Sequence, residues 1–399
     1  TTGDTVQVYA RFNEVLGGNP TFTLINNNQE YVIPTEDVIV TGPNDEGYYT
    51  YKINYEVKAD EMDEGEITLK ISNIYDRAGN KTEDITKPTN GHRVYIDRVN
   101  PEVEKVQIFN KDNSSSQYIK NGETVRILAT FKETLTVNPT ITFNGESKLA
   151  TQISGGNGEV IYSADFVIPE DEAELAEGRL TFTVSDYEDL AGNKGVILDQ
   201  NVASNSLTYD RTLPIVFSNN SIGKDDKFSY VSIKLSDENT ITKLVINGQE
   251  FPHTGKYIDI NDGDIYSFPE GENTIEFTDA AGNKNSYTFT VDKTAPVYSA
   301  MGIFNWTNNN DKSGDVTYAT KDEHIRLFVA FPEMLDTNPK VDIYGKDGKV
   351  TTLDLEYGEE AKFYFVEFDT TDELDLPEGK INYRIYGYKD QAGNTGKEL

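Results

Sequence analysis

The six-residue segment that begins at Asp76 most constrains what this chain can fold into, because it returns three more times. It reads DRAGNK at Asp76, DLAGNK at Asp189, DAAGNK at Asp279 and DQAGNT at Asp390, at intervals of 113, 90 and 111 residues. A catalytic loop is rarely built four times in one chain, whereas a structural unit often is. The hexamer therefore predicts four like units.

Three other sequence markers recur in a fixed order around the hexamer. They are an F-x-E-x-L-x-x-N-P segment, a Glu-Gly pair 9 or 12 residues ahead of the hexamer's Asp, and a D-[RK]-x-x-P segment behind it. Several markers in one order indicate true internal repeats rather than chance. The markers begin at Phe12, Phe131 and Phe331 for the first, at Glu64, Glu177, Glu270 and Glu378 for the second, and at Asp97, Asp210 and Asp292 for the third.

The D-[RK]-x-x-P segment suggests where one repeat ends and the next begins, because Pro cannot donate a hydrogen bond to a β-ladder. We therefore predict repeat 1 at 1–98, repeat 2 at 99–212, repeat 3 at 213–294 and repeat 4 at 295–399. Alignment of the markers indicates that repeat 1 lacks its first strand and repeat 4 its last. Repeat 3 is shorter and lacks the F-x-E-x-L marker. The linkers are short and contain no Gly/Ser-rich run, so we expect an elongated rod.

Residue alternation predicts an all-β fold. Apolar and polar residues alternate before each hexamer, as at Ile67, Leu69 and Ile71, which is typical of half-buried antiparallel strands. Asn144-Gly145 and Asn247-Gly248 predict tight hairpin turns, because Asn and Gly tolerate positive φ. The hexamer itself suits a hairpin turn, since Asp can accept backbone N–H bonds and Gly supplies a left-handed conformation.

The composition narrows the possible partners. The formal net charge is −32, from 68 acidic and 36 basic residues, so nucleic acid and anionic membrane surfaces would be repelled. Cations are the natural counterparts of so many carboxylates, and Ca²⁺ takes oxygen ligands. The chain has no Cys, which excludes disulfides and thiolate metal sites. No apolar run is long enough to span a bilayer, so we expect no membrane insertion within this fragment.

The markers together resemble the bacterial immunoglobulin-like repeats of cell-surface adhesins and S-layer proteins. The segments that carry the resemblance are FNEVL, FKETL and FPEML together with DRAGN, DLAGN, DAAGN and DQAGN, and they cover essentially the whole chain. The resemblance implies tandem immunoglobulin-like antiparallel β-sandwiches of about seven strands each. It also implies an extracellular location at a bacterial cell surface or cell wall. A Gram-positive source fits best with the absence of Cys.

The resemblance also implies where a metal would bind, because some members of this family hold structural Ca²⁺ between modules through such Asp residues. Hexamer Asp residues that precede a further repeat are the first choice, so Asp390 is left aside. In the alternative interpretation the hexamer Asp only closes its own hairpin. The Glu of the F-x-E-x-L marker could bind metal, but we expect it to cap a turn or form a salt bridge. The implied ligands are Asp76, Asp97, Asp189, Asp210, Asp279 and Asp292, and the three marker Glu residues are Glu14, Glu133 and Glu333.

These observations predict a protein that is not an enzyme. The three His lie in different repeats, and no P-loop, GxSxG or HExxH pattern occurs. The leading hypothesis is an extracellular repeat region that acts as a stalk, spacer or lattice element, with self-association at the cell surface as one form of contact. One alternative is an adhesive module that binds a host glycan or matrix protein, for which Trp306, the only Trp, is the candidate ligand residue. The other is a set of accessory modules in a large secreted carbohydrate-active enzyme.

Overall fold

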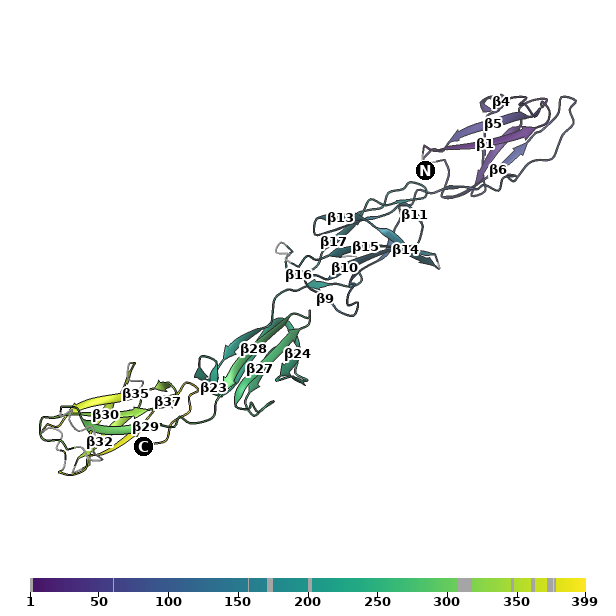
Figure 1. The fold of residues 1–399 in the computed structure, drawn as a ribbon. Helices are drawn as coiled ribbons and strands as arrows, with labels where there is room; N and C mark the ends of the chain where they lie inside the picture. The colour runs from purple at the N-terminus through teal and green to yellow at the C-terminus, as the bar shows by residue number, and fades with distance from the viewer. Residues whose placement is uncertain are drawn as a thin grey trace. The chain divides into compact units, whose positions relative to one another are not determined.

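The computed structural model describes residues 3–59, 61–156, 158–170, 175–199, 203–307, 318–345, 348–359, 363–371, 376 and 378–399. Nearly all regular structure in these ranges is β-strand (Figure 1). The one helical segment described is the 3-10 turn η1 (Thr35–Asp37), and no described helix has the length and apolar character that crossing a lipid bilayer requires. The chain divides into two compact units, Thr1–Asp210 and Arg211–Leu399.

Buried apolar side chains form four separate clusters, two in each unit. The first unit contains one cluster with members from Val6 to Ile96 and another with members from Val106 to Tyr209. The second unit contains one from Phe228 to Val291 and another from Ile325 to Tyr388. Each cluster draws its buried members from one repeat, so each repeat has a hydrophobic core of its own.

Repeats 1 and 2 each fold as two antiparallel sheets that enclose the core. In repeat 1, one sheet has the order β1-β5-β4 and the other β3-β2-β6-β7. The strands are β1 (Thr5–Phe12), β2 (Thr21–Asn26), β3 (Gln29–Val32), β4 (Ile39–Thr41), β5 (Tyr49–Glu56), β6 (Gly65–Ser72) and β7 (Val94–Ile96).

Repeat 2 has the sheet orders β14-β15-β10-β8 and β13-β12-β17-β19, with two small additions, β11-β18 and β16-β20-β9. Its strands are β8 (Val103–Asn110), β9 (Tyr118–Ile119), β10 (Thr124–Phe131), β11 (Leu135–Val137), β12 (Thr140–Phe143), β13 (Glu146–Leu149), β14 (Thr151–Gly156), β15 (Glu159–Val167), β16 (Gly178–Arg179), β17 (Phe182–Ser185), β18 (Glu188–Asp189), β19 (Leu198–Asp199) and β20 (Thr208–Tyr209).

Repeat 3 differs, because one strand passes through both layers. β24 (Ser232–Ile246) has 15 residues, and its pairing register shifts between Ser236 and Ile241. A bent strand of this kind can switch between sheets, and the eight strands consequently form one continuous sheet. The other strands are β21 (Ile215–Asn219), β22 (Ile222–Lys224), β23 (Lys227–Tyr230), β25 (Gln249–Phe251), β26 (Gly255–Asn261), β27 (Gly271–Asp279) and β28 (Lys284–Val291).

Repeat 4 has the sheet orders β29-β30-β35-β34 and β33-β32-β36, with the small pair β31-β37. Its strands are β29 (Ala300–Asn305), β30 (His324–Ala330), β31 (Leu335–Thr337), β32 (Lys340–Gly345), β33 (Gly348–Asp354), β34 (Glu356–Gly358), β35 (Phe363–Asp369), β36 (Asn382–Tyr386) and β37 (Lys389–Asp390).

The chain is thus all-β and consists of tandem immunoglobulin-like β-sandwiches, as the sequence predicts. The predicted hairpin turns are confirmed as well. Asn144 and Gly145 both have positive φ between β12 and β13, and Asn247 and Gly248 both have positive φ between β24 and β25. These values fit the turn type that matches the twist of the flanking strands.

The F-x-E-x-L marker fixes one edge of the core in repeats 1, 2 and 4. Its Phe packs against a Tyr from the neighbouring sheet strand, as for Phe12 and Tyr51 with ring centroids 5.6 Å apart. The backbone N–H of the marker's Leu donates to the hydroxyl of the same Tyr, as from Leu16 to Tyr51 over 2.9 Å. The equivalent pairs are Leu135 with Tyr162 and Leu335 with Tyr364.

Replacing Tyr51 by Phe should therefore destabilise repeat 1 by about 1–3 kcal/mol, because the buried N–H of Leu16 loses its acceptor. Hydrogen exchange of amides in β1 and β5 measures this, since their protection depends on the stability of repeat 1. Tyr9→Phe is the matched control, because Tyr9 is 51% exposed. Equal protection in wild type and Tyr51→Phe would show that the bond contributes nothing.

Candidate metal centre at the repeat junctions

The hexamer forms the same hydrogen-bonded turn in every repeat. One carboxylate oxygen of its Asp accepts the backbone N–H of the Asn four residues later, and the Asn side-chain amide donates to the other oxygen. In repeat 2 these bonds join Asp189 and Asn193 over 2.9 and 2.8 Å. Gly192 between them has a φ of 84°, a conformation that favours Gly. The equivalent pairs are Asp76 with Asn80, Asp279 with Asn283, and Asp390 with Asn394.

In repeats 2 and 4 the hexamer's Asn also binds the linker that precedes its own repeat. The Asn193 side-chain amide donates to the backbone carbonyl of Asp97 over 3.1 Å, and that of Asn394 donates to the carbonyl of Asp292 over 2.8 Å. Asp97 and Asp292 begin the D-[RK]-x-x-P segments that leave repeats 1 and 3. In repeats 2 and 4 the hexamer therefore faces the junction before its repeat.

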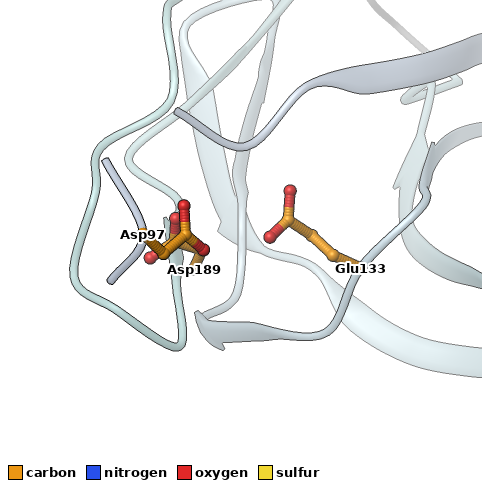
Figure 2. Close-up of side chains that lie close together, drawn as sticks. All are labelled: Asp97, Glu133 and Asp189. Carbon is orange, nitrogen blue, oxygen red and sulfur yellow. The ribbon is translucent and has the colours of Figure 1, made fainter. Parts of the chain in front are cut away.

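This arrangement brings three carboxylates together at each of two junctions. In the first unit they belong to Asp97, Glu133 and Asp189, and one oxygen from each lies within 4.8 Å of the others. Figure 2 shows Asp97 and Asp189 side by side, with the Glu133 side chain reaching toward them from another segment. The second unit repeats the cluster with Asp292, Glu333 and Asp390 under the same 4.8 Å limit.

In the cluster of Asp97, Glu133 and Asp189, no described basic side chain pairs with the negatively charged carboxylates. Asp189 is fully buried, and Asp97 and Glu133 are half-buried. Burial raises the pKa of the Glu133 carboxyl above its ordinary value, and the negative charges of Asp189 and Asp97 raise that pKa further. Among the described residues, no Lys or Arg forms an ion pair with any of the three.

The basic residue of the D-[RK]-x-x-P marker lies next to the cluster in sequence but binds the preceding repeat instead. The Arg98 guanidinium donates to the backbone carbonyls of Met62 and Lys58. The Lys293 ammonium likewise donates to the carbonyl of Phe268 and pairs with Asp262. These bonds fix the exit of repeats 1 and 3 and leave the acidic side chain of the marker facing the next repeat.

The Glu of the Glu-Gly marker holds the D-[RK]-x-x-P segment in place at the end of repeats 1 and 3. The carboxylate of Glu64 accepts the backbone N–H of Arg98 over 3.0 Å, and that of Glu270 accepts the N–H of Lys293 over 2.9 Å. The following Gly adopts positive φ in all four repeats, with values from 100° to 132°. The Glu-Gly and D-[RK]-x-x-P markers, which are more than 20 residues apart in the sequence, are thus joined by hydrogen bonds at the end of repeats 1 and 3.

The donor set fits Ca²⁺. Carboxylate oxygens bind Ca²⁺ at about 2.3–2.6 Å, so two oxygens on one ion lie at most about 4.6–5.2 Å apart. Oxygens within 4.8 Å of one another can share one ion without a change in the backbone. The backbone carbonyls of the junction and water can complete the six to eight ligands that Ca²⁺ usually takes.

The acidic cluster of the second junction is influenced by a basic side chain, whereas no described basic side chain affects the pKa of Glu133 at the first. Beside the cluster of Asp292, Glu333 and Asp390 lies a pocket of about 310 Å³ whose lining includes Lys227. The Lys227 ammonium donates to the Gln391 side chain over 3.0 Å, and its charge partly offsets the upward shift in the pKa of Glu333 caused by burial, Asp390 and Asp292. Lys224 also pairs with Asp336 across the same junction, over 2.5 Å.

The other predicted ligands, Asp76, Asp210 and Asp279, belong to neither of these two clusters. Asp76 is half-buried in the turn of repeat 1, and its bonds to Asn80 lower the pKa of its carboxyl. Asp279 is buried, and burial together with the charge of Asp237 raises the pKa of its carboxyl. Asp237 occupies the place in repeat 3 that Glu133 occupies in repeat 2. Asp210 is buried and is the last residue of the first unit.

The clusters contain Asp97, Asp189 and Asp292, which the sequence predicts as ligands, together with three residues that it does not. For Glu133 and Glu333 the sequence predicts a turn cap or a salt bridge, and Asp390 is not predicted as a ligand because no repeat follows it. The signal that could have found them is the order of the markers, since an exit segment precedes repeats 2 and 4, whereas none precedes repeat 1 in this sequence.

No known protein-family profile matches the sequence, and no curated protein matches it either. Solved structures with immunoglobulin domains align with most of the chain. A three-domain fragment of titin, I67–I69 in an E-to-A mutated variant, covers 75% of this chain and 99% of its own, with 11% identity and a TM-score of 0.29. A fragment of a 1.5-MDa bacterial ice-binding adhesin covers 76% and 96%, with 15% identity and a TM-score of 0.28. A similarity at this level carries no information on ligand or activity.

Proposed function

We propose that this chain is a non-enzymatic, extracellular repeat region that acts as a spacer or stalk in a bacterial surface protein, with Ca²⁺ bound at its repeat junctions. The observation that carries the proposal is the recurrence of the three-carboxylate cluster, built from the same three markers at a junction in each unit. The resemblance of those markers to bacterial surface repeats supports the location. The separate small cores of the four repeats support a mechanical role over catalysis in a deep cleft.

Each cluster joins one residue of a repeat's exit to two residues of the next repeat. Asp97 belongs to the exit of repeat 1, whereas Glu133 and Asp189 belong to two loops of repeat 2. A bound Ca²⁺ would supply the positive charge that these carboxylates otherwise lack. The three side chains then hold the linker against repeat 2, in addition to the Asn193 bond to Asp97. The junction becomes stiff because its two sides share ligands.

Calorimetric titration of the metal-free chain with CaCl₂ tests the metal assignment. We expect at least two sites per chain, with a Kd on the order of 10⁻⁴ M or tighter. Asp97→Asn should weaken one of them about tenfold or more, because it removes a charged ligand. Asp76→Asn is the matched control, since Asp76 forms the same turn without a described acidic cluster. An absence of heat and of competition with a Ca²⁺ indicator would reject the metal while leaving the spacer role standing.

A second test compares the stability of Glu133→Gln with that of wild type as a function of pH. The difference in stability should have opposite signs without and with Ca²⁺. Without Ca²⁺ the variant should be more stable than wild type at pH 7, because the raised pKa of Glu133 means that its ionisation disfavours the folded state. This advantage should grow as the pH rises above the ordinary Glu range of about 4–4.5 and level off above the raised pKa. With saturating Ca²⁺ the variant should instead be less stable, because a charged ligand is gone.

Urea unfolding of both proteins between pH 4 and pH 8, in EDTA and in CaCl₂, measures these differences. The difference in unfolding free energy between variant and wild type at each pH reports on Glu133 alone, because other carboxylates contribute equally to both proteins. One of these is Asp165, whose pKa Arg126 lowers to about 2. A variant that is less stable in EDTA at every pH would show that the Glu133 carboxylate is already compensated in the folded protein.

A further inference from the structure

The outer face of one sheet in repeat 4 carries a continuous row of aromatic rings. Along β30 and β35 the inward residues belong to the core, so the alternate residues face outward. Adjacent ring centroids in the row lie 5.2–6.0 Å apart, and the Arg326 guanidinium lies 3.6 Å from the Trp306 ring centre and 4.8 Å from that of Phe365. We call this surface the aromatic face, and it consists of Phe304, Trp306, Arg326, Phe328, Phe363 and Phe365.

Two glycines leave room for rings of the aromatic face. A Cβ at Gly302 would come within 2.7 Å of the Phe328 ring, and one at Gly358 within 2.9 Å of the Phe365 ring. Both rings therefore occupy the space that a side chain of the neighbouring strand would fill. Trp306 keeps 42% of its surface exposed.

The fold does not require aromatic residues at most of these positions, because repeat 2 has the same sheet with only one of them, Phe109 at the place of Phe304. The strand registers align Trp306 with Lys111, Phe328 with Leu128, and Phe365 with Ser163. The Arg326–Glu367 pair has its counterpart in Arg126–Asp165, whereas His324 and Asp369 correspond to Thr124 and Val167. Repeat 1 has Tyr9 at the place of Phe328, but it has Lys52 at the place of Phe365 and Gln7 at that of Arg326.

The charged groups at the end of the aromatic face balance one another. Glu367 pairs with Arg326, and it also accepts from His324 Nε2 over 3.0 Å. Asp369 accepts from His324 Nδ1 over 2.7 Å. These two acceptors raise the pKa of His324, which favours its protonated form. When His324 is protonated, its charge and that of Arg326 offset the two carboxylates, while the carboxylates and guanidinium remain able to hydrogen-bond hydroxyl groups.

We propose that the aromatic face of repeat 4 binds an uncharged glycan. The aromatic rings would stack on the apolar C–H faces of sugar rings, and Arg326, Glu367 and Asp369 would hydrogen-bond sugar hydroxyls at the end of the row. An anionic ligand is disfavoured by the net charge of −32 and by the balanced charges of this face. This proposal is independent of Ca²⁺ at the junctions and adds a binding role to the spacer.

The chain's single Trp makes the test direct, because its intrinsic tryptophan fluorescence comes from Trp306 alone. The probes are uncharged hexasaccharides, namely cello-, malto-, manno-, xylo- and chito-oligomers, with heparin and polygalacturonate as anionic comparisons. The full chain should show a saturable change in Trp306 fluorescence with at least one uncharged probe. Affinity electrophoresis in the matching polysaccharide should retard the protein and supply a readout that does not depend on Trp306.

The variants Phe328→Leu and Phe365→Ser introduce the residues of repeat 2 and should fold, because the same register accepts them there. Each should weaken binding about tenfold or more, whereas Leu128→Ala in repeat 2 should leave it unchanged. The proposal is overturned if no uncharged probe binds, if heparin binds equally well, or if the variants bind like wild type. It is also overturned if the face instead causes self-association that Phe365→Ser removes.

Discussion

Replacing Gly195 by Ala should destabilise repeat 2 by about 3 kcal/mol or more, one of the largest effects expected of a single methyl group in this chain. A Cβ at Gly195 would lie 1.8 Å from the ring of Tyr187, which is fully buried. The ring cannot move aside without losing its edge contact with Phe131 and its hydroxyl bond to the carbonyl of Val196. The φ of Gly195 lies outside the left-handed region, so the requirement is for space and not for backbone freedom.

Hydrogen exchange of repeat 2 measures the loss, since the chain has four cores and a single unfolding transition is not expected. Repeat 1 provides the matched control, because Ile74 and Thr82 occupy the places of Tyr187 and Gly195 and make the same backbone bond. The double variant Tyr187→Ile with Gly195→Thr should therefore recover much of the stability. Wild-type protection in Gly195→Ala alone would contradict the packing described here.

Adding Ca²⁺ should stabilise the first unit by about 2.7 kcal/mol when its concentration is a hundred times the Kd, because the ion binds only the folded cluster. The second unit should gain less, since the Lys227 ammonium already faces its acidic cluster. Scanning calorimetry in CaCl₂ and in EDTA, with Asp97→Asn and Asp292→Asn to assign the transitions, measures both gains. Lys227→Met should increase the gain of the second unit, and equal gains in both units of wild type would contradict this role for Lys227.

The fold could be predicted from the sequence because its strands and turns depend on residues close together in the chain. Alternation such as Ile67, Leu69 and Ile71 and turns such as Asn144-Gly145 act over a few residues. Repeat 3 departs from the expected pair of separate sheets, because β24 bends and continues from one layer into the other. That bend lies at 237–240, inside the segment that replaces the F-x-E-x-L marker.

The candidate site could be predicted only in part, because its residues meet through the packing of one repeat on the linker before it. Asp97 and Asp189 are 92 positions apart, and no local sequence pattern indicates whether a hexamer contacts the linker before its repeat or the one after it. The hydrogen bond from Asn193 to the Asp97 carbonyl shows that the hexamer of repeat 2 contacts the linker before its repeat. Sequence order alone points to the following junction, which favours Asp76 as a ligand and disfavours Asp390.

The bonds between Tyr hydroxyls and the F-x-E-x-L segments were also beyond sequence reasoning. Tyr51 and Leu16 are 35 positions apart, and alternation predicts only that Tyr51 faces the core. The partner of its hydroxyl is set by the way the marker crosses between the sheets. The aromatic face likewise required strand registers, because Phe328 and Phe365 are neighbours only through the pairing of β30 with β35.

The most direct test of the central claim is a distance distribution between repeats 1 and 2 with and without Ca²⁺. The chain has no Cys, so spin labels at Glu56→Cys and Gln152→Cys, both exposed, report this one distance by pulsed electron resonance. We predict a single narrow distribution in CaCl₂ that broadens in EDTA and stays broad in both when Asp97 and Asp189 are replaced by Asn. Identical distributions in CaCl₂ and EDTA for the labelled wild type would contradict a Ca²⁺-stiffened junction.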